Sequence, residues 1–490
     1  MKRIFKREKI FRLFFISLFL IFNINSAFAV TKAEFIGGLL RARGIDWSGT
    51  YEFDNNSPVA FMLRTGLITD SVGNVNQNVT RREALRWIIQ SLGLSFEAGI
   101  LSDYPTGFDD EKKLNSYEKG CLVVASNMNP VIFTKSKNFN GQNALSSQES
   151  KIVLDRVRDA SRNLTLDMVR NPLKGLKVLI HREGVPTGIP AWRFYFDGIK
   201  TRTAADAFKN SLKSEGFDVN VFSSEGVYGV RTQKLESYHD VKKLISNAKA
   251  RGLNFRILPS MANTNTRIVP QYWVMLIIDP AYWKIAPLIS KKSSKDLLKL
   301  SELSKQYGTR ASINAGFFGI TNPGRGYPIG ALKINGNLIS EAHDGRGCLA
   351  WNNDDEAVFK VVYSEEINQW DDMENIIQAG PLLLDEGFAS TIPENFNNSL
   401  TSVRHPRSAV GLNANGDWVF ILVDGRNGMH ASGATITELT DILRAQGVLY
   451  ALNLDGGGSS EIIINGKIYN SPSDGKERKI SYGLGVIPIK

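Results

Sequence analysis

The sequence contains few cysteines and histidines, and this scarcity excludes several classes of protein. Among 490 residues there are two cysteines, Cys121 and Cys348, and five histidines. A disulfide-stabilised scaffold concentrates many more cysteines in a short chain. Because no Cys-x-x-Cys pair or Cys/His cluster occurs, the sequence gives no sign of structural zinc. We expect both cysteines to be small buried residues in a globular protein of about three domains.

Long apolar runs are missing after residue 29, so no later stretch is long enough to cross a membrane. Residues 1–29 differ from the rest, since a basic head is followed by an apolar core from Phe14 to Phe22 and then by Ala27-Phe28-Ala29. That pattern is typical of a secretory signal peptide, and an uncleaved membrane anchor is the alternative. The sequence therefore predicts a secreted protein that is soluble or held at the cell envelope by binding.

The excess of positive charge is modest once residues 1–29 are set aside. Six basic residues and one acidic residue leave with them, so the formal charge falls from +10 to +5. A charge of +5 on so long a chain is weak support for nucleic-acid binding, and we expect no nucleic-acid partner. The same charge suits an anionic cell-wall polymer equally well.

Residues 30–165 contain a helix-start pattern that occurs three times. Thr31, Thr80 and Ser146 are each followed three residues later by a glutamate. This is the capping-box arrangement, which satisfies the exposed N–H groups at the start of a helix. Apolar residues follow at helical spacing, so the sequence predicts an amphipathic helix after each of the three.

One of these segments belongs to a longer motif. Phe53-Asp54, a helix ending in Gly66-Leu67-Ile68, a polar loop and Val79-Thr80-Arg81-Arg82-Glu83 follow one another. This order resembles an S-layer homology repeat. The resemblance implies that residues 30–165 hold the protein on peptidoglycan or on another cell-wall polymer. The alternative is a helical bundle in which Thr-Arg-x-Glu is only a cap.

Residues 175–260 predict a small α/β module that follows a boundary at Asn171-Pro172 and Gly175. Strands and two glycine-terminated helices are expected in the order β-α-β-β-α-β, a split βαβ pattern. The expected strands are Lys177–His181, Ala191–Phe196, Phe217–Ser223, Gly226–Arg231 and Phe255–Leu258, and the helices are Thr203–Gly216 and His239–Gly252. The order is similar to that of the sporulation-related repeat, which implies binding to glycan strands of peptidoglycan. A spacer or docking module without a ligand is the alternative.

From about residue 270 onward, long apolar strands alternate with glycine-rich turns. Trp273–Ile278 predicts a strand, while Ser293–Tyr307 and Gly433–Gly447 predict helices. We expect residues 270–490 to form an α+β domain with an extensive mixed sheet. The fold class of the whole chain is then multidomain, with α-helical N-terminal repeats, a small split βαβ module and this C-terminal domain.

A short stretch near the C-terminus combines an apolar strand with an unusual turn. Tyr450–Leu454 is followed directly by Asp455-Gly456-Gly457-Gly458-Ser459. Three consecutive glycines allow backbone N–H groups to approach a bound group closely, and such N–H clusters suit anions. The alternative is a plain glycine turn between two strands.

Five further motifs precede this stretch in a fixed order. They are Asn314-Ala315-Gly316-Phe317-Phe318, Gln378-Ala379-Gly380-Pro381-Leu382, Arg404-His405-Pro406-Arg407-Ser408-Ala409-Val410-Gly411, Val423-Asp424-Gly425-Arg426 and Thr435-x-x-Glu438-Leu439. Together with the glycine stretch they resemble the phosphodiester glycosidase family over about residues 270–490. The resemblance implies a hydrolase that cleaves a sugar from a phosphodiester at its anomeric carbon.

The charged residues of these motifs fit that chemistry. Departure of the phosphate leaves an oxocarbenium-like centre, which a carboxylate can stabilise or supply with activated water. Asp455 is the leading candidate for this role, followed by Asp424 and Glu438. Recognition of phosphate suits the planar fork of arginine, for which Arg407 and Arg426 are the candidates.

Polar groups are also needed to orient the sugar hydroxyls and the phosphate. The candidates are Asn314, Gln378, Asn453 and Ser459, together with the backbone of Gly456, Gly457 and Gly458. Each charged candidate has a structural alternative: Arg407 paired with an acid, Glu438 as a helix cap, and Asp424 in an Asp-Gly turn. No cofactor is expected. A carboxylate such as Asp455 could hold a divalent cation, but no ordered ligand spacing predicts one.

Two functions therefore remain open from the sequence. The first is an exported, wall-associated hydrolase that acts on a glycosyl phosphodiester of the envelope. The second is a non-catalytic envelope protein that binds polysaccharide or peptidoglycan through all its parts. The joint presence of Asp424, Arg426, Asp455 and Arg407 favours the hydrolase, because a binding protein has no chemical need for that set.

Overall fold

The structure of the protein is a computed structural model that describes residues 29–45, 57–134, 136–186, 190–224, 227–235, 237–261, 269–353, 356–367, 370 and 372–489. The predicted signal peptide, apart from Ala29, and the Phe53-Asp54 motif lie outside the described residues. The chain divides into two compact units, Met1–Thr165 and Leu166–Lys490. None of the helices in the described residues is long and apolar enough to cross a membrane.

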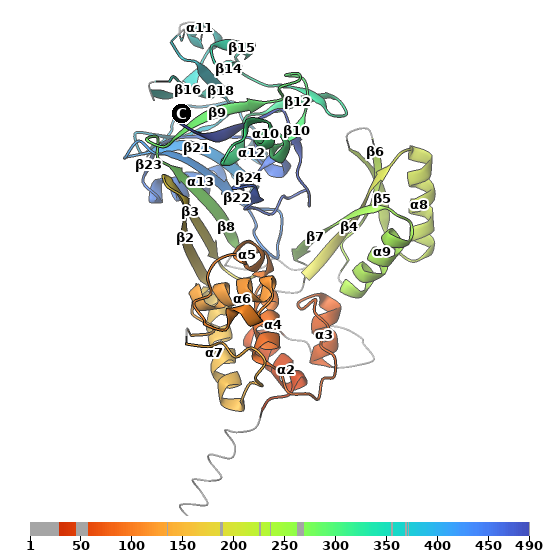
Figure 1. The fold of residues 1–490 in the computed structure, drawn as a ribbon. Coiled ribbons are helices and arrows are strands. Elements are labelled where there is room, and N and C mark those ends of the chain that lie inside the picture. Colours follow the sequence, from red (N-terminus) through yellow and green to blue (C-terminus); the bar gives the residue numbers. More distant parts are fainter. Residues whose placement is uncertain are drawn as a thin grey trace, which may run out of the picture. The chain divides into compact units, whose positions relative to one another are not determined.

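Three helices of the first unit begin at the predicted capping boxes (Figure 1). The side chains of Thr31, Thr80 and Ser146 each accept a hydrogen bond from the N–H of the glutamate three residues later. Asn115 caps a further helix in the same way. The helices of this unit are α2 (Lys32–Ala42), α3 (Pro58–Thr65), α4 (Arg81–Ser91), α5 (Ser95–Ile100), α6 (Ser116–Asn127) and α7 (Ser147–Asn163).

The starts of α2, α4 and α7 are joined in a closed ring. Three isolated antiparallel bridges link Ala29 to Ser146, Thr31 to Asn78, and Thr80 to Ala144. Each helix start thus pairs with both of the others. Ion pairs follow the same circuit, since Lys32 at the start of α2 lies 2.8 Å from Glu83 of α4, and Arg81 of α4 pairs with Glu149 of α7.

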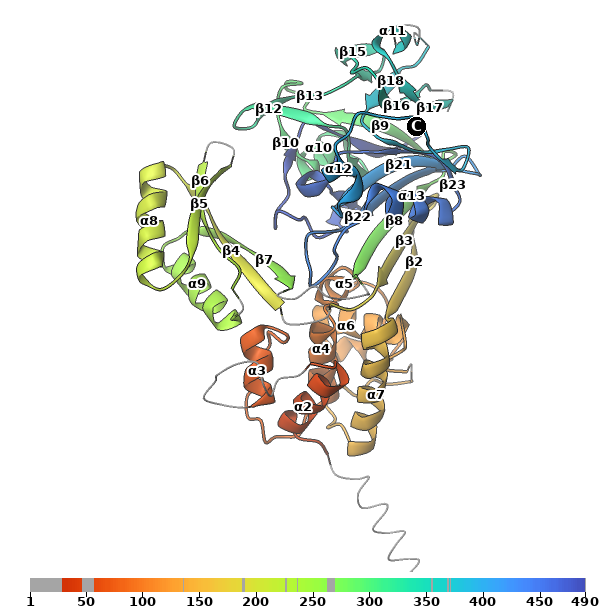
Figure 2. The same ribbon diagram turned by 180° about the vertical axis from the view of Figure 1, so that it is seen from behind.

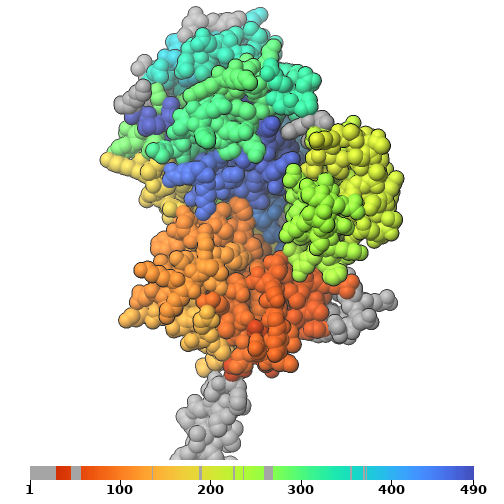
Figure 3. All heavy atoms as spheres, turned by 45° about the vertical axis from the view of Figure 1, so that its right-hand side comes forward, coloured from red at the N-terminus to blue at the C-terminus, as the bar shows by residue number. Residues whose placement is uncertain are grey.

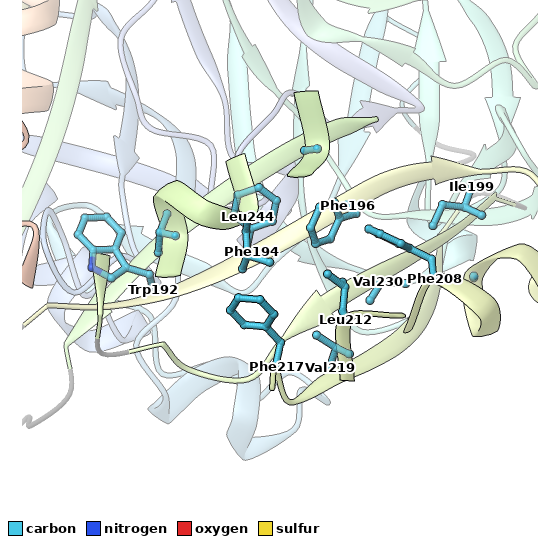
Figure 4. Close-up of a cluster of buried hydrophobic side chains, with 13 residues drawn as sticks. Trp192, Phe194, Phe196, Ile199, Phe208, Leu212, Phe217, Val219, Val230 and Leu244 are labelled. Atoms are coloured by element: carbon cyan, nitrogen blue, oxygen red, sulfur yellow. The ribbon is translucent and has the colours of Figure 1, made fainter. Parts of the chain in front are cut away.

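The middle module contains the predicted element order, β4-α8-β5-β6-α9-β7. Its four strands form one sheet in the order β5-β6-β4-β7. The elements are β4 (Pro190–Ile199), α8 (Arg202–Ser214), β5 (Val219–Ser224), β6 (Val227–Thr232), α9 (Tyr238–Ala250) and β7 (Asn254–Met261). Figure 4 shows Phe194 and Phe196 of β4 pointing into a core with Leu212 of α8 and Leu244 of α9. Because strand side chains alternate, Arg193 and Tyr195 face the opposite way.

Two predictions about the border of this module are wrong. The strand expected at Lys177–His181 exists as β3 (Leu176–Glu183), but it pairs with β8 (Gln271–Ile278) in the large sheet of the C-terminal domain. The expected boundary at Asn171-Pro172 lies inside another strand, β2 (Thr165–Leu173). Its proline residue is tolerated because β2 lies near the edge of the sheet, where a ladder hydrogen bond can be missing.

The C-terminal domain is built from several sheets (Figures 1 and 2). The second unit contributes to the large sheet, in spatial order, β2, β3, β8, β22 (Trp418–Val423), β21 (Arg407–Asn413), β23 (Val448–Asn453), β19 (Leu382–Asp385) and β20 (Phe388–Ala389). A five-stranded sheet runs in the order β25 (Lys467–Ile468), β24 (Ile462–Ile464), β11 (Ala311–Asn314), β27 (Tyr482–Pro488) and β9 (Trp283–Ile289). Pairing of β9 with β27 brings green and blue segments together in Figure 3.

A second five-stranded sheet and two small sheets complete the domain. Its order is β15 (Asn337–Ser340), β14 (Leu332–Ile334), β18 (Asn375–Gln378), β16 (Arg346–Trp351) and β17 (Ala357–Val362). The small sheets pair β12 (Phe318–Asn322) with β13 (Arg325–Pro328), and β10 (Leu298–Lys299) with β26 (Lys479–Ile480). The helices are α10 (Leu300–Tyr307), α11 (Ser364–Ile367), α12 (Asn398–Ser402) and α13 (Ile436–Ala445).

Neighbouring strands from β3 to β20 in the large sheet are all antiparallel, so the prediction of a mixed sheet is wrong for this part of the domain. The reason lies in the path of the chain. Helix α13 connects β22 to β23, which run in the same direction, but β21 occupies the position between them. The helix still packs on the sheet, since Leu439 and Leu443 join the core formed by its strands.

Two further predictions concern the cysteines and the start of helix α10. Both cysteines are buried and free, as predicted. Helix α10 starts at Leu300 and not at Ser293, because the carboxylate of Glu302 accepts a hydrogen bond from the N–H of Lys299 at 2.9 Å and thereby caps the helix start. The residues before it form a turn in which Asp296 pairs with Arg325 at 2.8 Å.

Two glycines in neighbouring helices of the first unit provide a matched test of its packing. A Cβ atom on Gly120 of α6 would lie 1.7 Å from the carbonyl oxygen of Ala98 in α5, while one on Gly99 would meet nothing within 4 Å. We expect Gly120→Ala to lower the stability of this unit by about 1–3 kcal/mol through overpacking. Gly99→Ala should raise it by about 0.5–1 kcal/mol through helix propensity. Calorimetric unfolding measures both, and equal shifts would contradict the packing of α5 on α6.

Candidate active site

Three segments of the C-terminal domain meet where strands of the large sheet end. The start of β21 lies beside the end of β22, with Arg407 opposite Val423, and beside the end of β23, with Ala409 opposite Asn453. The turns that follow β22 and β23 carry Arg426 and Asp455, respectively. Antiparallel register therefore brings motifs that are far apart in the sequence to one edge of the sheet.

Two cavities open at this edge. The small cavity has a volume of about 300 Å³, and the large cavity has a volume of about 930 Å³. Both are lined by Asp455, Arg426 and Arg478. These three side chains thus stand at the junction of the two cavities.

Asp455 is held firmly at this junction. Its N–H donates to the carbonyl of Ala315 at 2.8 Å, and its carbonyl accepts from Nδ2 of Asn314 at 2.6 Å. The carboxylate accepts a hydrogen bond from the Gly456 N–H at 2.9 Å. Burial raises the pKa of the Asp455 carboxyl to about 6, against the opposing effects of nearby hydrogen bonds and of the Arg478 and Arg426 charges.

The N–H groups of the first two glycines in the turn are used within the fold. The Gly456 N–H is used by Asp455, and the Gly457 N–H donates to the carbonyl of Pro406 at 3.0 Å, so neither is available to an anion. A Cβ atom on Gly457 would lie 3.0 Å from a guanidinium nitrogen of Arg426. One on Gly458 would lie 2.0 Å from a guanidinium nitrogen of Arg478. The glycines therefore give arginine side chains close access to the backbone.

Arg426 adopts an uncommon backbone conformation, with φ at +60°. A positive φ in a non-glycine residue costs free energy and often marks a functional position. Nη2 of Arg426 lies 3.1 Å from Nδ1 of His405, which therefore accepts, while Nε2 of His405 donates to the carbonyl of Ser399 at 3.0 Å. Burial and the Arg426 and Arg407 charges lower the pKa of His405, so the imidazole stays neutral and this tautomer is favoured.

Arg407 lines the small cavity, but its donors are directed to the main chain. Nε donates to the carbonyl of Ala434 at 2.8 Å, and Nη2 donates to those of Leu400 and Val403 at 2.6 and 2.9 Å. The side chain is 3% exposed, and burial lowers its pKa to about 10. These contacts give Arg407 a positioning role for the loop that forms the cavity wall.

Two of the predicted carboxylates line neither cavity. Asp424 is 1% exposed and accepts from the Ser471 N–H at 2.7 Å, with Nε2 of His430 at 2.9 Å. It holds the loop that leads to Arg478. Glu438 makes the capping box of α13 and pairs with Arg404, so the helix-cap alternative describes its contacts.

Some of the predicted polar residues line the two cavities, and others lie behind them. Asn453 lines the small cavity with Gly456, Gly457 and Gly458, and Ser459 lines the large one. Asn314 and Gln378 are buried, and neither lines either of these two cavities. Oδ1 of Asn314 accepts from the Ser408 hydroxyl at 2.7 Å, whereas Oε1 of Gln378 accepts from the His343 N–H at 2.7 Å. Both amides position main chain and side chains behind the site.

Several residues of the site are missing from the sequence-based set. Arg478 lies in the loop after β25, where it is paired with Asp474 at 2.8 Å. Phe317 lines the small cavity, although in the sequence it stands out only as part of the Asn314–Phe318 motif. The i,i+4 spacing of Asp474 and Arg478 is a signal for a mutual ion pair, but it does not indicate where a loop will fold. In the described part of the chain no three His, Cys, Asp or Glu side chains are grouped so as to hold a metal ion.

Comparison with known proteins identifies the class of this domain. Residues 307–487 match the family model for phosphodiester glycosidase, so the C-terminal part of the chain is a domain of that family. This range contains Asp455, Arg426 and Arg478, and thus the junction of the two cavities.

Particular relatives are similar over limited stretches. The SPbeta prophage-derived uncharacterized protein YomE of Bacillus subtilis is 42% identical over 79 residues, which cover 16% of this chain and 12% of that protein. The N-acetylglucosamine-1-phosphodiester alpha-N-acetylglucosaminidase of Bos taurus is 27% identical over 198 residues, 37% of this chain and 36% of that protein. The solved catalytic domain of the zebrafish enzyme of that name, auto-inhibited by its pro-peptide, is 22% identical with a TM-score of 0.38, covering 44% of this chain and 77% of that one. The chain thus spans about a third or less of the length of these curated relatives.

A buried carboxyl group next to Glu477, which lines the large cavity, gives a stability prediction. Glu461 is 3% exposed, and burial together with neighbouring Glu477 raises its pKa from 4.5 to about 9. The folded protein keeps Glu461 neutral where the unfolded chain ionises it, so stability falls as pH rises from about 4.5 to 9. Glu461→Gln removes this dependence, and its urea midpoint relative to wild type should rise between pH 5 and pH 8. The exposed Glu365→Gln is the control, and parallel curves for Glu461→Gln and wild type would contradict the assignment.

Proposed function

We propose that the C-terminal domain hydrolyses a glycosyl phosphodiester at the junction of the two cavities. One observation carries the proposal: a carboxylate, Asp455, lines both cavities together with two arginines, Arg426 and Arg478. The arginines suit the phosphate, because guanidinium groups bind its oxygens in a planar fork. The carboxylate suits the anomeric carbon, where positive charge develops.

The reaction breaks the bond between the anomeric carbon and the phosphate oxygen. Water supplies a hydroxyl group to the carbon and a proton to solvent, and the products are a free sugar and a phosphate monoester. The phosphate is a good leaving group, so strong help from a general acid is less necessary than with ordinary glycosides. Asp455 in its ionised form stabilises the oxocarbenium-like transition state or accepts a proton from the attacking water. Neutral His405 orients Arg426.

The assignment of cavities follows from their walls. The small cavity has Phe317, Asn453 and the glycine turn around Asp455, which suits one sugar with an apolar face and several hydroxyl groups. The large cavity then receives the group on the far side of the phosphate. The name of the bovine relative supports N-acetylglucosamine as the first sugar to test.

Asp455→Asn provides the central test of this activity. We expect kcat for a glycosyl phosphodiester, or for a sugar nucleotide such as UDP-N-acetylglucosamine, to fall by roughly 10²–10⁴-fold. Because Asp455 acts as a carboxylate with a pKa of about 6, wild-type activity should fall as pH drops through that value. At pH 5 about a tenth of the plateau rate should remain, since a pKa one unit above the pH leaves about a tenth ionised.

Released sugar is measured across pH 4.5–8 for wild type, Asp455→Asn and the surface control Asp441→Asn. Asp441 pairs with Arg444 on α13, away from both cavities, and its variant should keep full activity. Unchanged activity in Asp455→Asn, or activity that increases below pH 6, would remove the role given to Asp455. If wild type releases no sugar from several substrates, the non-catalytic envelope-binding function is supported instead.

We further propose that the protein is exported and is held at the cell wall by residues 30–165. The pattern of residues 1–29 and the resemblance to S-layer homology repeats support this localisation. The ring that joins the starts of α2, α4 and α7 supports a threefold repeat in this unit.

Sedimentation with purified cell walls tests the anchor. Residues 30–490 should sediment with walls, while residues 166–490, which form a compact unit, should stay mostly in the supernatant. The comparison is made at about 0.5 M salt, where attraction between exposed charges is largely screened. Equal sedimentation of the two proteins would contradict wall binding by the first unit.

A further inference from the structure

We propose that the open face of the middle-module sheet binds a polyanionic, phosphodiester-rich polymer and presents it to the active site. The inference rests on the proposed function, because it names the class of substrate that reaches the same site. The surface, called the basic sheet face below, is formed by Arg193, Tyr195, Phe222, Arg231 and Arg256.

Strand alternation creates the basic sheet face. On β4, Trp192, Phe194 and Phe196 belong to the apolar core shared with α8 and α9, so the residues between them lie on the uncovered side. Pairing then aligns three of these residues across the sheet, since Tyr195 is opposite Arg231 of β6 and opposite Arg256 of β7. An aromatic ring is thus flanked by two guanidinium groups.

Two arginines of this face have guanidinium groups that are not paired with an acid among the described residues. Within the described part of the chain, Arg193 and Arg231 make no ion pair and no hydrogen bond through their side chains. Arg256 is different, because it lies 2.6 Å from Asp197 and over the ring of Tyr195 at 4.6 Å. Arg256 therefore orders the face, while Arg193 and Arg231 remain available for a ligand.

The face continues into the proposed active site. It lines the large cavity of about 930 Å³ together with Arg426 and Asp455. Arg256 donates to the carbonyl of Asp474, in the loop that carries Arg478. The walls of this cavity contain eight lysines and arginines and three carboxylates, Asp455, Asp474 and Glu477.

This combination selects the ligand class. A phosphodiester polymer carries one negative charge per repeat, and a row of cations meets several repeats at once. Tyr195 and Phe222 offer flat apolar surfaces for the sugar or alditol units between phosphates. A neutral glycan would leave the free arginines without partners, so a charged polymer fits better than an uncharged one.

Kinetics on two substrates of different length test the proposal with residues 30–490. The short substrate is the methyl phosphodiester of N-acetylglucosamine 1-phosphate, which places only a methyl group beyond the phosphate, and the long one is an oligomer of N-acetylglucosamine 1-phosphate. Arg193→Ala combined with Arg231→Ala should raise KM for the oligomer about tenfold, equivalent to about 1.4 kcal/mol of binding. Both kcat values and KM for the short substrate should stay unchanged. The control, Lys213→Ala with Lys249→Ala, removes two charges from the exposed surfaces of α8 and α9. It should leave KM and kcat unchanged for both substrates.

A binding measurement makes the surface testable without catalysis. Poly(glycerol phosphate), which has no glycosyl phosphodiester to cleave, should bind wild type and the lysine control and bind the double arginine variant about tenfold more weakly. If neither substrate is hydrolysed but this difference is found, the proposed function fails and the binding surface stands. Equal losses on both substrates, no loss in polymer binding, or equal binding of an uncharged chitin oligomer would overturn the proposal. Unchanged circular dichroism and thermal midpoints establish that both variants are folded.

Discussion

The candidate site depends on two guanidinium groups that lie directly against a backbone without side chains. Arg426 and Arg478 occupy the space that Cβ atoms would take at Gly457 and Gly458. This close approach is what brings positive charge to both sides of the turn that begins at Asp455. Burial of a carboxylate is costly, and nearby cations reduce that cost. The absence of side chains at Gly457 and Gly458 thus lets the two arginines come close, and their positive charge lowers the cost of burying the Asp455 carboxylate.

The sheet supplies the accuracy that this arrangement needs. Because β21 lies between β22 and β23, residues from three separate motifs reach the same edge in a fixed register. Amides behind the site then fix the main chain, as Asn314 does for Asp455 at 2.6 Å. Arg426 and Asp455 lie in turns directly after the strands β22 and β23, so the rigid sheet fixes their positions more closely than a long loop would.

The sequence was most informative where local interactions decide the structure. Capping boxes at Thr31, Thr80 and Ser146 predicted three helix starts, and the element order of the middle module was also predicted. The strand predicted at Tyr450–Leu454, before the glycine turn, is present as β23. These features depend on neighbours a few residues away, which a sequence displays directly.

Long-range contacts explain what the sequence did not show. Strand β3 was predicted, but its pairing partner was not. The partner, β8, begins at Gln271, 88 residues after β3 ends at Glu183, and no local pattern specifies that pairing. Asp424 and Glu438 are carboxylates, as the reaction needs, but both have partners within the fold. Asp424 contacts His430, and Glu438 forms an ion pair with Arg404. Arg478 enters the site through a loop, where neither periodicity nor a glycine motif marks it. Whether an acid faces a cavity or a partner is decided by tertiary packing.

The ring of bridges in the first unit sets a limit on its architecture. In an open array of repeats each unit contacts only its neighbours, so the array can be lengthened from either end. Here the segment before α7 returns to the segment before α2, and the circuit has no free end. Its contacts also join residues far apart in the sequence, so the circuit closes only when the chain through Ser146 is available. Within the described residues the starts of α2, α4 and α7 thus form a closed circuit, and none of these three helix starts is left without a partner that could continue it.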